Sequence, residues 1–178
     1  MAVSSSTNPA DYIAIKNTIA RYCIALDSKN WELLKTNVFH PDIQGDFPFD
    51  HDMRGADVLL QRIEGRLKDI PTQHSLTTQM IDIQPDGATA HATTYFTGLH
   101  FGRGEWAGHH LTSWGQYVDV LQLVKGRWLI TKRTCLFTAR DGDERLMEGV
   151  GPRGVAKSSQ GHGRANSSTT RLTLGGVI

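Results

Sequence analysis

Apolar residues in the first part of the chain recur at the spacing of amphipathic helices. Between Asp11 and Leu26 they return every three or four residues, which predicts a helix with one buried face. Asn30 is a suitable cap for a second, shorter helix that begins at Trp31 and ends before His40-Pro41. The buried face of the first helix is predicted to contain Ile13, Ile15, Ile19, Tyr22, Cys23 and Leu26.

A short extended stretch and a third helix are predicted next. The extended stretch runs from about Ile43 to Phe49, and Gly55 opens a helix that ends near Pro71. The buried face of this third helix is predicted to contain Val58, Leu59, Ile63 and Leu67.

The hydrophobic period then changes to that of strands. Four long segments rich in Thr, Val and aromatic residues are separated by turn signals such as Pro85-Asp86-Gly87 and Lys125-Gly126. Helices followed by a strand meander predict an α+β fold, in which helices pack on one face of an antiparallel sheet. Strands of this length curl, so we expect a conical pocket between sheet and helices. The four segments are Thr72–Gln84, Ala88–Phe101, His110–Val124 and Arg127–Ala139.

Length and composition indicate one globular domain. The 178 residues are 39% hydrophobic and carry a net charge of +1, without the basic stripe of a nucleic-acid surface or the long apolar run of a membrane span. We therefore expect a cytoplasmic protein that binds neither nucleic acid nor membranes. We expect residues 1–8 to be a flexible N-terminus, 9–140 the domain, and 141–178 a mobile Gly- and Ser-rich tail. Within this tail, Asp143 to Val150 could form a helical turn over the pocket mouth.

The most informative polar pair is Asp27, at the end of the first helix, and His74, at the start of the sheet. A carboxylate can hold one imidazole nitrogen in a fixed tautomer and leave the other free to exchange a proton. Asp27 could instead be a helix-terminal residue bonded to backbone amides. His100, on the following strand, is a second candidate that is equally consistent with a structural role.

Several other residues are candidates for the same pocket. Strand alternation puts Leu111, Ser113, Gly115, Tyr117 and Asp119 on one face, so Tyr117 could reach the cavity as an acid or hydrogen-bond donor. Trp106 lies in a glycine-rich loop and could line the rim, whereas Trp114 and Trp128 fit the core. His109 and His110 point to opposite strand faces and cannot serve one metal site, and we expect no metal and no cofactor.

Three passages resemble the SnoaL-like proteins of the nuclear transport factor 2-like superfamily, and they are closest to scytalone dehydratase. The resemblance covers about Asp11 to Arg140 and implies a cone-shaped, curved antiparallel or mixed sheet closed by three N-terminal helices. The passages are Ala25-Leu26-Asp27-Ser28-Lys29-Asn30-Trp31, Pro71-Thr72-Gln73-His74, and Gly115-Gln116-Tyr117-Val118-Asp119 followed by Gly126-Arg127-Trp128-Leu129-Ile130.

The resemblance also implies roles for individual residues. Asp27 takes the place of the aspartate that orients catalytic histidines, His74 that of the first histidine, and His100 is the candidate for the second. Two tyrosines of scytalone dehydratase correspond to Leu26 and Phe47, so dehydration of the same substrate is not expected. Tyr117 stands where that enzyme has an asparagine and could return one phenol to the cavity.

We therefore predict a cofactor-independent lyase or isomerase, such as a dehydratase or cyclase, that acts on a small polycyclic or polyketide-like intermediate of secondary metabolism. Asp27, His74, His100 and Tyr117 are the predicted catalytic residues, and Leu26, Phe47, Trp106 and Asp119 are the predicted substrate contacts. The resemblance implies a homo-oligomer, either a dimer or a trimer. Two alternatives are a non-catalytic binding module of this fold and an accessory subunit of a ring-hydroxylating oxygenase.

Overall fold

The computed structural model of the chain describes residues 8–147, which form three helices and one curved, six-stranded sheet. The helices are α1 (Pro9–Ser28), α2 (Trp31–Asn37) and α3 (Ala56–Leu67). The strands are β1 (Phe39–Phe47), β2 (Asp50–Arg54), β3 (Thr72–Ile83), β4 (Thr89–Phe101), β5 (His110–Val124) and β6 (Arg127–Gly142), and two short 3₁₀ turns are η1 (Gly104–Trp106) and η2 (Glu144–Met147).

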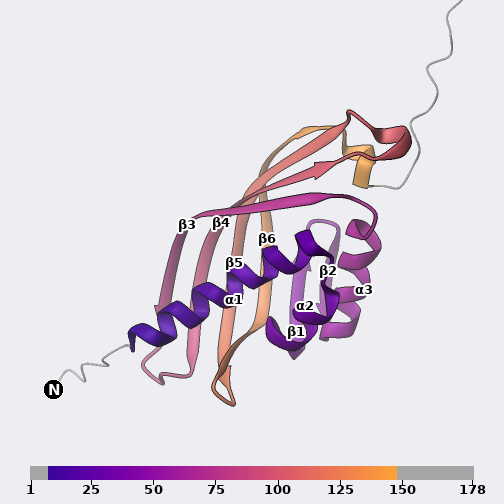
Figure 1. Ribbon diagram of the computed structural model, residues 1–178. Helices are drawn as coiled ribbons and strands as arrows, with labels where there is room; N and C mark the ends of the chain where they lie inside the picture. The colour runs from indigo at the N-terminus through magenta and orange to yellow at the C-terminus, as the bar shows by residue number, and fades with distance from the viewer. Residues whose placement is uncertain (1–7, 148–178) are drawn as a thin grey trace, which may run out of the picture.

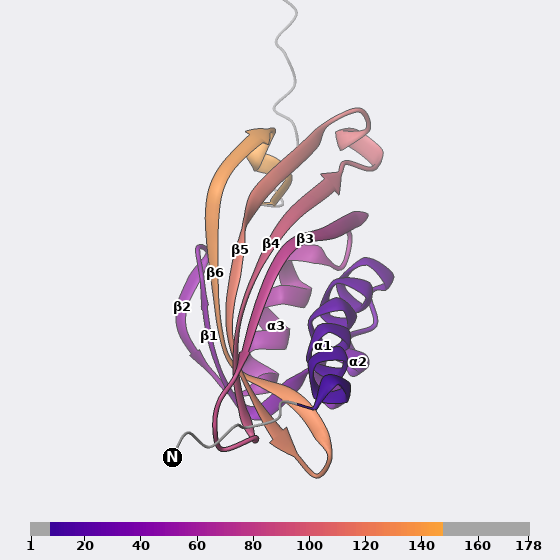
Figure 2. The same ribbon diagram turned by 90° about the vertical axis from the view of Figure 1, so that its left-hand side faces the viewer.

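The sheet is mixed and open. Its strand order is β2-β1-β6-β5-β4-β3, and every neighbouring pair is antiparallel except β1 and β6, which are parallel. The four long strands bend together, as Figure 1 shows, and the three helices lie on the inner side of that bend in Figure 2. The predicted α+β cone closed by three N-terminal helices is confirmed.

Asparagine side chains cap the starts of α1 and α2, and the cap at Asn30 was predicted. The Asn8 side chain accepts a hydrogen bond from the Ala10 amide at the start of α1, and the Asn30 side chain accepts one from Leu33 at the start of α2. Helix α1 ends at Ser28, and the left-handed backbone of the next residue, Lys29 (φ 58°), lets its amide bond back to the carbonyls of Ala25 and Leu26. This sharp ending leaves Asp27 beside the start of β3.

The core lies between the inner face of the sheet and the helices. It includes Ile15, Ile19 and Leu26 of α1, together with Leu59 and Ile63 of α3. Both cysteines, Cys23 and Cys135, are buried free thiols.

Three apolar residues that we expected in the core are instead exposed. Ile13 and Val58 lie on the solvent sides of α1 and α3, because the buried faces of these helices are centred on Ile15 and on Leu59. Trp114 lies on the outer face of β5, because strand alternation gives it the side opposite to Tyr117. Strand β2 was also not expected, because its polar sequence buries only Met53.

Candidate active site

Asp27 and His74 meet where α1 ends and β3 begins. The Nδ1 atom of His74 lies 2.7 Å from Oδ1 of Asp27, and the backbone amide of His74 donates to Oδ2 at 2.8 Å. The hydroxyl of Thr72 donates to Oδ1 at 2.9 Å and accepts a hydrogen bond from Lys29 Nζ at 3.0 Å. Asp27 is therefore held by two side chains and one backbone amide of β3, and not by amides of its own helix.

This arrangement fixes which nitrogen of His74 is available for chemistry. Burial alone would raise the pKa of the Asp27 carboxyl, but the hydrogen bonds from His74 and Thr72 outweigh burial and lower it. The ionised carboxylate can only accept, so the Nδ1 of His74 is inferred to carry the proton. The Nε2 atom of a neutral His74 is then an unprotonated acceptor. The His74 side chain is 6% exposed and lines a cavity.

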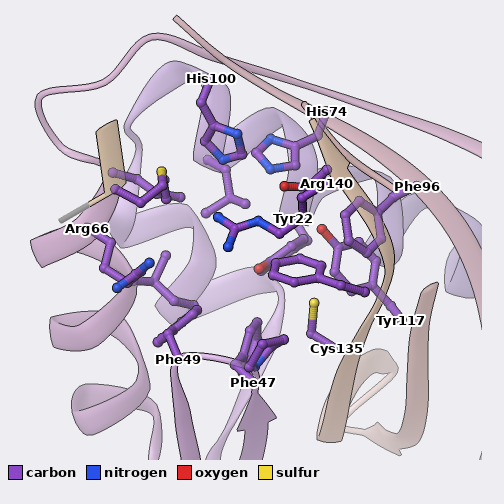
Figure 3. Close-up of a pocket in the computed structure, with 17 residues that line it drawn as sticks. Tyr22, Phe47, Phe49, Arg66, His74, Phe96, His100, Tyr117, Cys135 and Arg140 are labelled. Atoms are coloured by element: carbon purple, nitrogen blue, oxygen red, sulfur yellow. The ribbon is translucent and has the colours of Figure 1, made fainter. Parts of the chain in front are cut away.

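The cavity occupies the space between α1, α3 and the inner face of the sheet. Its volume is about 340 Å³, which is in the lower part of the range for small-molecule sites. In Figure 3 the rings of His74 and His100 lie together at one side, and Phe47 and Phe49 lie at the other. The lining residues are Tyr22, Leu26, Phe47, Pro48, Phe49, Ile63, Arg66, Leu67, His74, Phe96, His100, Ser113, Tyr117, Cys135, Phe137, Arg140 and Met147.

His100 also lines the cavity but differs from His74 in its partner. Its ring lies 5.8 Å from that of His74 between centroids, and its Nδ1 lies 3.2 Å from the carbonyl oxygen of Leu111. Burial, with the nearby His74 and Arg140, lowers the pKa of His100 to about 4. A carbonyl can only accept, so the neutral ring carries its proton on Nδ1 and presents Nε2 as an acceptor. A neutral His100 therefore offers the cavity a hydrogen-bond acceptor and not a donor.

Tyr22 and Tyr117 supply phenols to the same cavity. The Tyr117 ring stacks on Phe96 with 4.3 Å between centroids and meets the edge of Tyr22 at 5.3 Å. Burial raises the pKa of both hydroxyls, so both remain protonated donors at neutral pH. Burial likewise raises the pKa of the Cys135 thiol to about 12, which makes it a poor nucleophile.

Two predicted substrate contacts lie elsewhere. Asp119 shares the inner face with Tyr117, as expected, but it is farther along β5 and forms a fully buried ion pair with Arg133 at 2.7 Å. The guanidinium of Arg133 covers the rings of Tyr22 and Tyr117 at 4.0 and 4.3 Å. Trp106 lies in η1, outside the cavity lining, with Arg145 over its ring. The other predicted contacts, Leu26 and Phe47, do line the cavity.

The structure adds residues that the sequence analysis missed. Gly98 pairs with His74 across β3 and β4, and a Cβ atom there would lie 3.2–3.3 Å from Cδ2 and Nε2 of His74. Arg66 and Arg140 line the cavity, and so does Ser113, which alternation had put on the same face as Tyr117. Only the cross-strand register shows that Arg140 lies beside Ser113. A helical turn was predicted from Asp143 to Val150. Its first part forms η2, and Met147, the last residue of η2, lines the cavity. The remainder of that predicted turn and of the tail, residues 148–178, lies outside the described residues, as do residues 1–7.

The part of the chain that the structure describes shows neither a metal cluster nor a membrane-spanning helix. Within residues 8–147, no three His, Cys, Asp or Glu side chains gather closely enough to hold a metal ion. Over the same residues, no helix has the length and hydropathy to cross a membrane.

Comparison with known proteins identifies the family. A model of the SnoaL-like domain matches residues 9–134, which is well over half of the chain. The chain therefore belongs to the SnoaL-like domain family of the nuclear transport factor 2-like superfamily. No curated protein sequence matches.

Solved structures show the same fold at low sequence identity. A Kribbella flavida protein is 15% identical with a TM-score of 0.72, covering 79% of this chain and 99% of its own. A candidate scytalone dehydratase from Novosphingobium aromaticivorans is 22% identical with a TM-score of 0.68, covering 86% and 99%. The hexachlorocyclohexane dehydrochlorinase LinA type 2 is 14% identical with a TM-score of 0.67, covering 82% and 96%. Proteins of this fold thus include lyase-type enzymes.

Proposed function

We propose that the protein is a cofactor-independent lyase or isomerase that uses His74 as its acid/base. The observation that carries this proposal is the 2.7 Å contact between Asp27 and His74 Nδ1, which leaves His74 Nε2 as an acceptor on a ring that lines the cavity. His74 would take a proton from a carbon next to a carbonyl, and Asp27 would stabilise the resulting imidazolium. The proton then returns at another carbon in an isomerisation or ring closure, or a leaving group departs in an elimination.

The developing enolate oxygen needs a hydrogen-bond donor, and Tyr117 is the predicted catalytic residue that can supply one. Its phenol remains protonated, whereas neutral His100 offers only an acceptor nitrogen, which can hold a substrate hydroxyl. Leu26, Phe47 and Phe96 give the cavity apolar walls. These walls and the volume of about 340 Å³ support a small polycyclic or polyketide-like substrate of secondary metabolism.

A proton-exchange experiment tests this function whatever the product is. Aromatic and polyketide ketones are incubated in D₂O with the protein, and mass spectrometry follows deuterium uptake and product formation. We expect turnover to fall by about 10²- to 10⁴-fold in His74→Ala and strongly in Asp27→Asn, which is the range of general acid/base catalysis. The control is His91→Ala, because His91 is an exposed imidazole on β4. Full turnover in both site variants would refute the assignment.

The outer face of the sheet supports assembly into a homo-oligomer. Tyr95, Trp114, Val118 and Leu136 are exposed and lie on neighbouring strands around Gln116. Such an apolar surface fits a second copy of the chain, and it is also what a non-catalytic binding module or an accessory subunit would use. Loss of turnover in the cavity variants alone would favour an enzyme over a binding module or an accessory subunit.

We further propose a cytoplasmic location, with neither nucleic acid nor membrane as partner.

A further inference from the structure

One row of inward-facing residues crosses the four long strands beside the cavity. The register pairs His74 on β3 with Gly98 on β4, Gly98 with Ser113 on β5, and Ser113 with Arg140 on β6. The proposed base therefore stands at one end of the row and a guanidinium stands at the other. Gly98, which has no side chain, lets the His74 ring lie close against the backbone of β4.

Two polar atoms of this row are buried without a partner. Among the described residues, neither Nε of Arg140 nor Oγ of Ser113 has a hydrogen-bond partner, although both side chains line the cavity. Buried polar groups are normally satisfied, because each missing hydrogen bond is costly. An N–H and an O–H on neighbouring strands can both donate to one oxygen of a ligand. In Figure 3 the Arg140 side chain enters the space below the two histidine rings.

The charged side chains that line the cavity favour an anionic ligand oxygen. Arg66 and Arg140 both line it, and none of the lining residues in the described part of the chain is Asp or Glu. His100 adds no charge at neutral pH. The acidic group beside Arg140 is Glu144, which lies on η2 and approaches its Nη1 at 3.3 Å from outside the lining.

We propose that the substrate carries an acidic oxygen, such as a carboxylate, and that Arg140 and Ser113 bind this oxygen at the end of the row opposite His74. This proposal rests on the proposed function, because it places the anion in the same cavity as the reacting carbon. Anchoring one end of the substrate would set which carbon faces His74. Arg140 and Ser113 are thus specificity-determining residues, and Glu144 weakens the anion site by competing for Arg140.

Direct binding tests the proposal. Aromatic carboxylic acids of one to three rings, for example 2-naphthoate, are compared by titration calorimetry with their neutral amides, for example 2-naphthamide. We expect the wild type to prefer at least one acid over its amide by about 10- to 100-fold, because hydrogen bonds to charged groups are strong. Arg140→Met should abolish this preference, Arg140→Lys should retain part of it, and Ser113→Ala should reduce it several-fold.

Two further variants sharpen the test. Glu144→Gln should bind the acid more tightly than the wild type, an effect of opposite sign that no loss of folding can mimic. Arg145→Gln should leave the preference unchanged, because Arg145 lies beside Glu144 but outside the cavity lining. Equal binding of every acid and its amide by the wild type, or a preference that survives in correctly folded Arg140→Met, would overturn the proposal. His74→Ala should keep the acid preference, so failure of the anion site and failure of the catalytic proposal give different results.

Discussion

Asp27 and Asp119 each hold a basic side chain at 2.7 Å, but their surroundings differ. Asp119 and Arg133 are fully buried beneath the two tyrosines and form two parallel hydrogen bonds. Asp27 is about a quarter exposed, and its partner His74 faces the cavity. An imidazole can exchange a proton near neutral pH, whereas a guanidinium cannot. A paired carboxylate is thus a candidate for acid/base catalysis only when its basic partner can gain and lose a proton near neutral pH. That partner must also face a cavity that a ligand can enter.

The largest expected effect comes from breaking the buried pair. Asp119→Asn leaves the Arg133 charge without a counter-ion, which should lower the free energy of unfolding by about 3–5 kcal/mol. Asp27→Asn should change it by only about 1 kcal/mol, because Asn can still accept a hydrogen bond and the site is partly hydrated. Urea denaturation of both variants measures the two changes. Equal destabilisation would remove the structural distinction between the two carboxylates.

The next effect concerns His100, a buried imidazole that lacks a carboxylate partner. Its pKa is about 4 in the folded state and about 6.5 when unfolded, so the unfolded chain binds more protons between these values. The free energy of unfolding should therefore fall as the pH drops from 6.5 to 4. The contribution of His100 is up to roughly 3 kcal/mol, because its pKa differs by about 2.5 between the two states and each unit is worth about 1.36 kcal/mol.

Comparison of the wild type with His100→Gln isolates this contribution. Both proteins keep Asp27, whose lowered pKa gives a loss of stability with the same sign at acidic pH. The free energy of unfolding is measured by denaturant titration at several pH values. We expect a shallower slope in the variant between pH 6.5 and 4. Parallel slopes would mean that His100 is not kept neutral by the fold.

Local sequence pattern predicted the elements well, but not the contacts that join them. Periodicity located the long strands, and alternation correctly put Tyr117 and Asp119 on one face. Alternation gives the face of each residue but not how far the cavity extends along β5. Asp119 was therefore predicted to contact the substrate, although it lies beyond the cavity lining. Its partner Arg133 lies fourteen residues later on the next strand, and Ser113 meets Arg140 only because of the register. That register shifts between Trp114 and Gly115, which no local pattern predicts.

A smaller effect is expected at Gly98, where a side chain would crowd the free nitrogen of His74. The Cβ of Gly98→Ala would lie 3.3 Å from Nε2, so the imidazole must move by a few tenths of an ångström. We expect turnover to fall by about tenfold, because small misplacements of a catalytic group are costly, with little change in stability. Gly65→Ala is the control, because a Cβ there meets nothing within 4 Å. Unchanged turnover in Gly98→Ala would argue against a role for Nε2.

The smallest expected effect is at Thr72, which links Asp27 to Lys29. Thr72→Val keeps the shape of the side chain but removes the 2.9 Å hydrogen bond to Asp27 and the acceptor of Lys29. Asp27 keeps both hydrogen bonds from His74, so we expect the free energy of unfolding to fall by about 1 kcal/mol and turnover to fall several-fold. Thr72→Ser, which retains the hydroxyl, should behave like the wild type. If Thr72→Ser lost as much turnover as Thr72→Val, then Thr72 would support the Asp27–His74 pair by packing and not by its hydrogen bond.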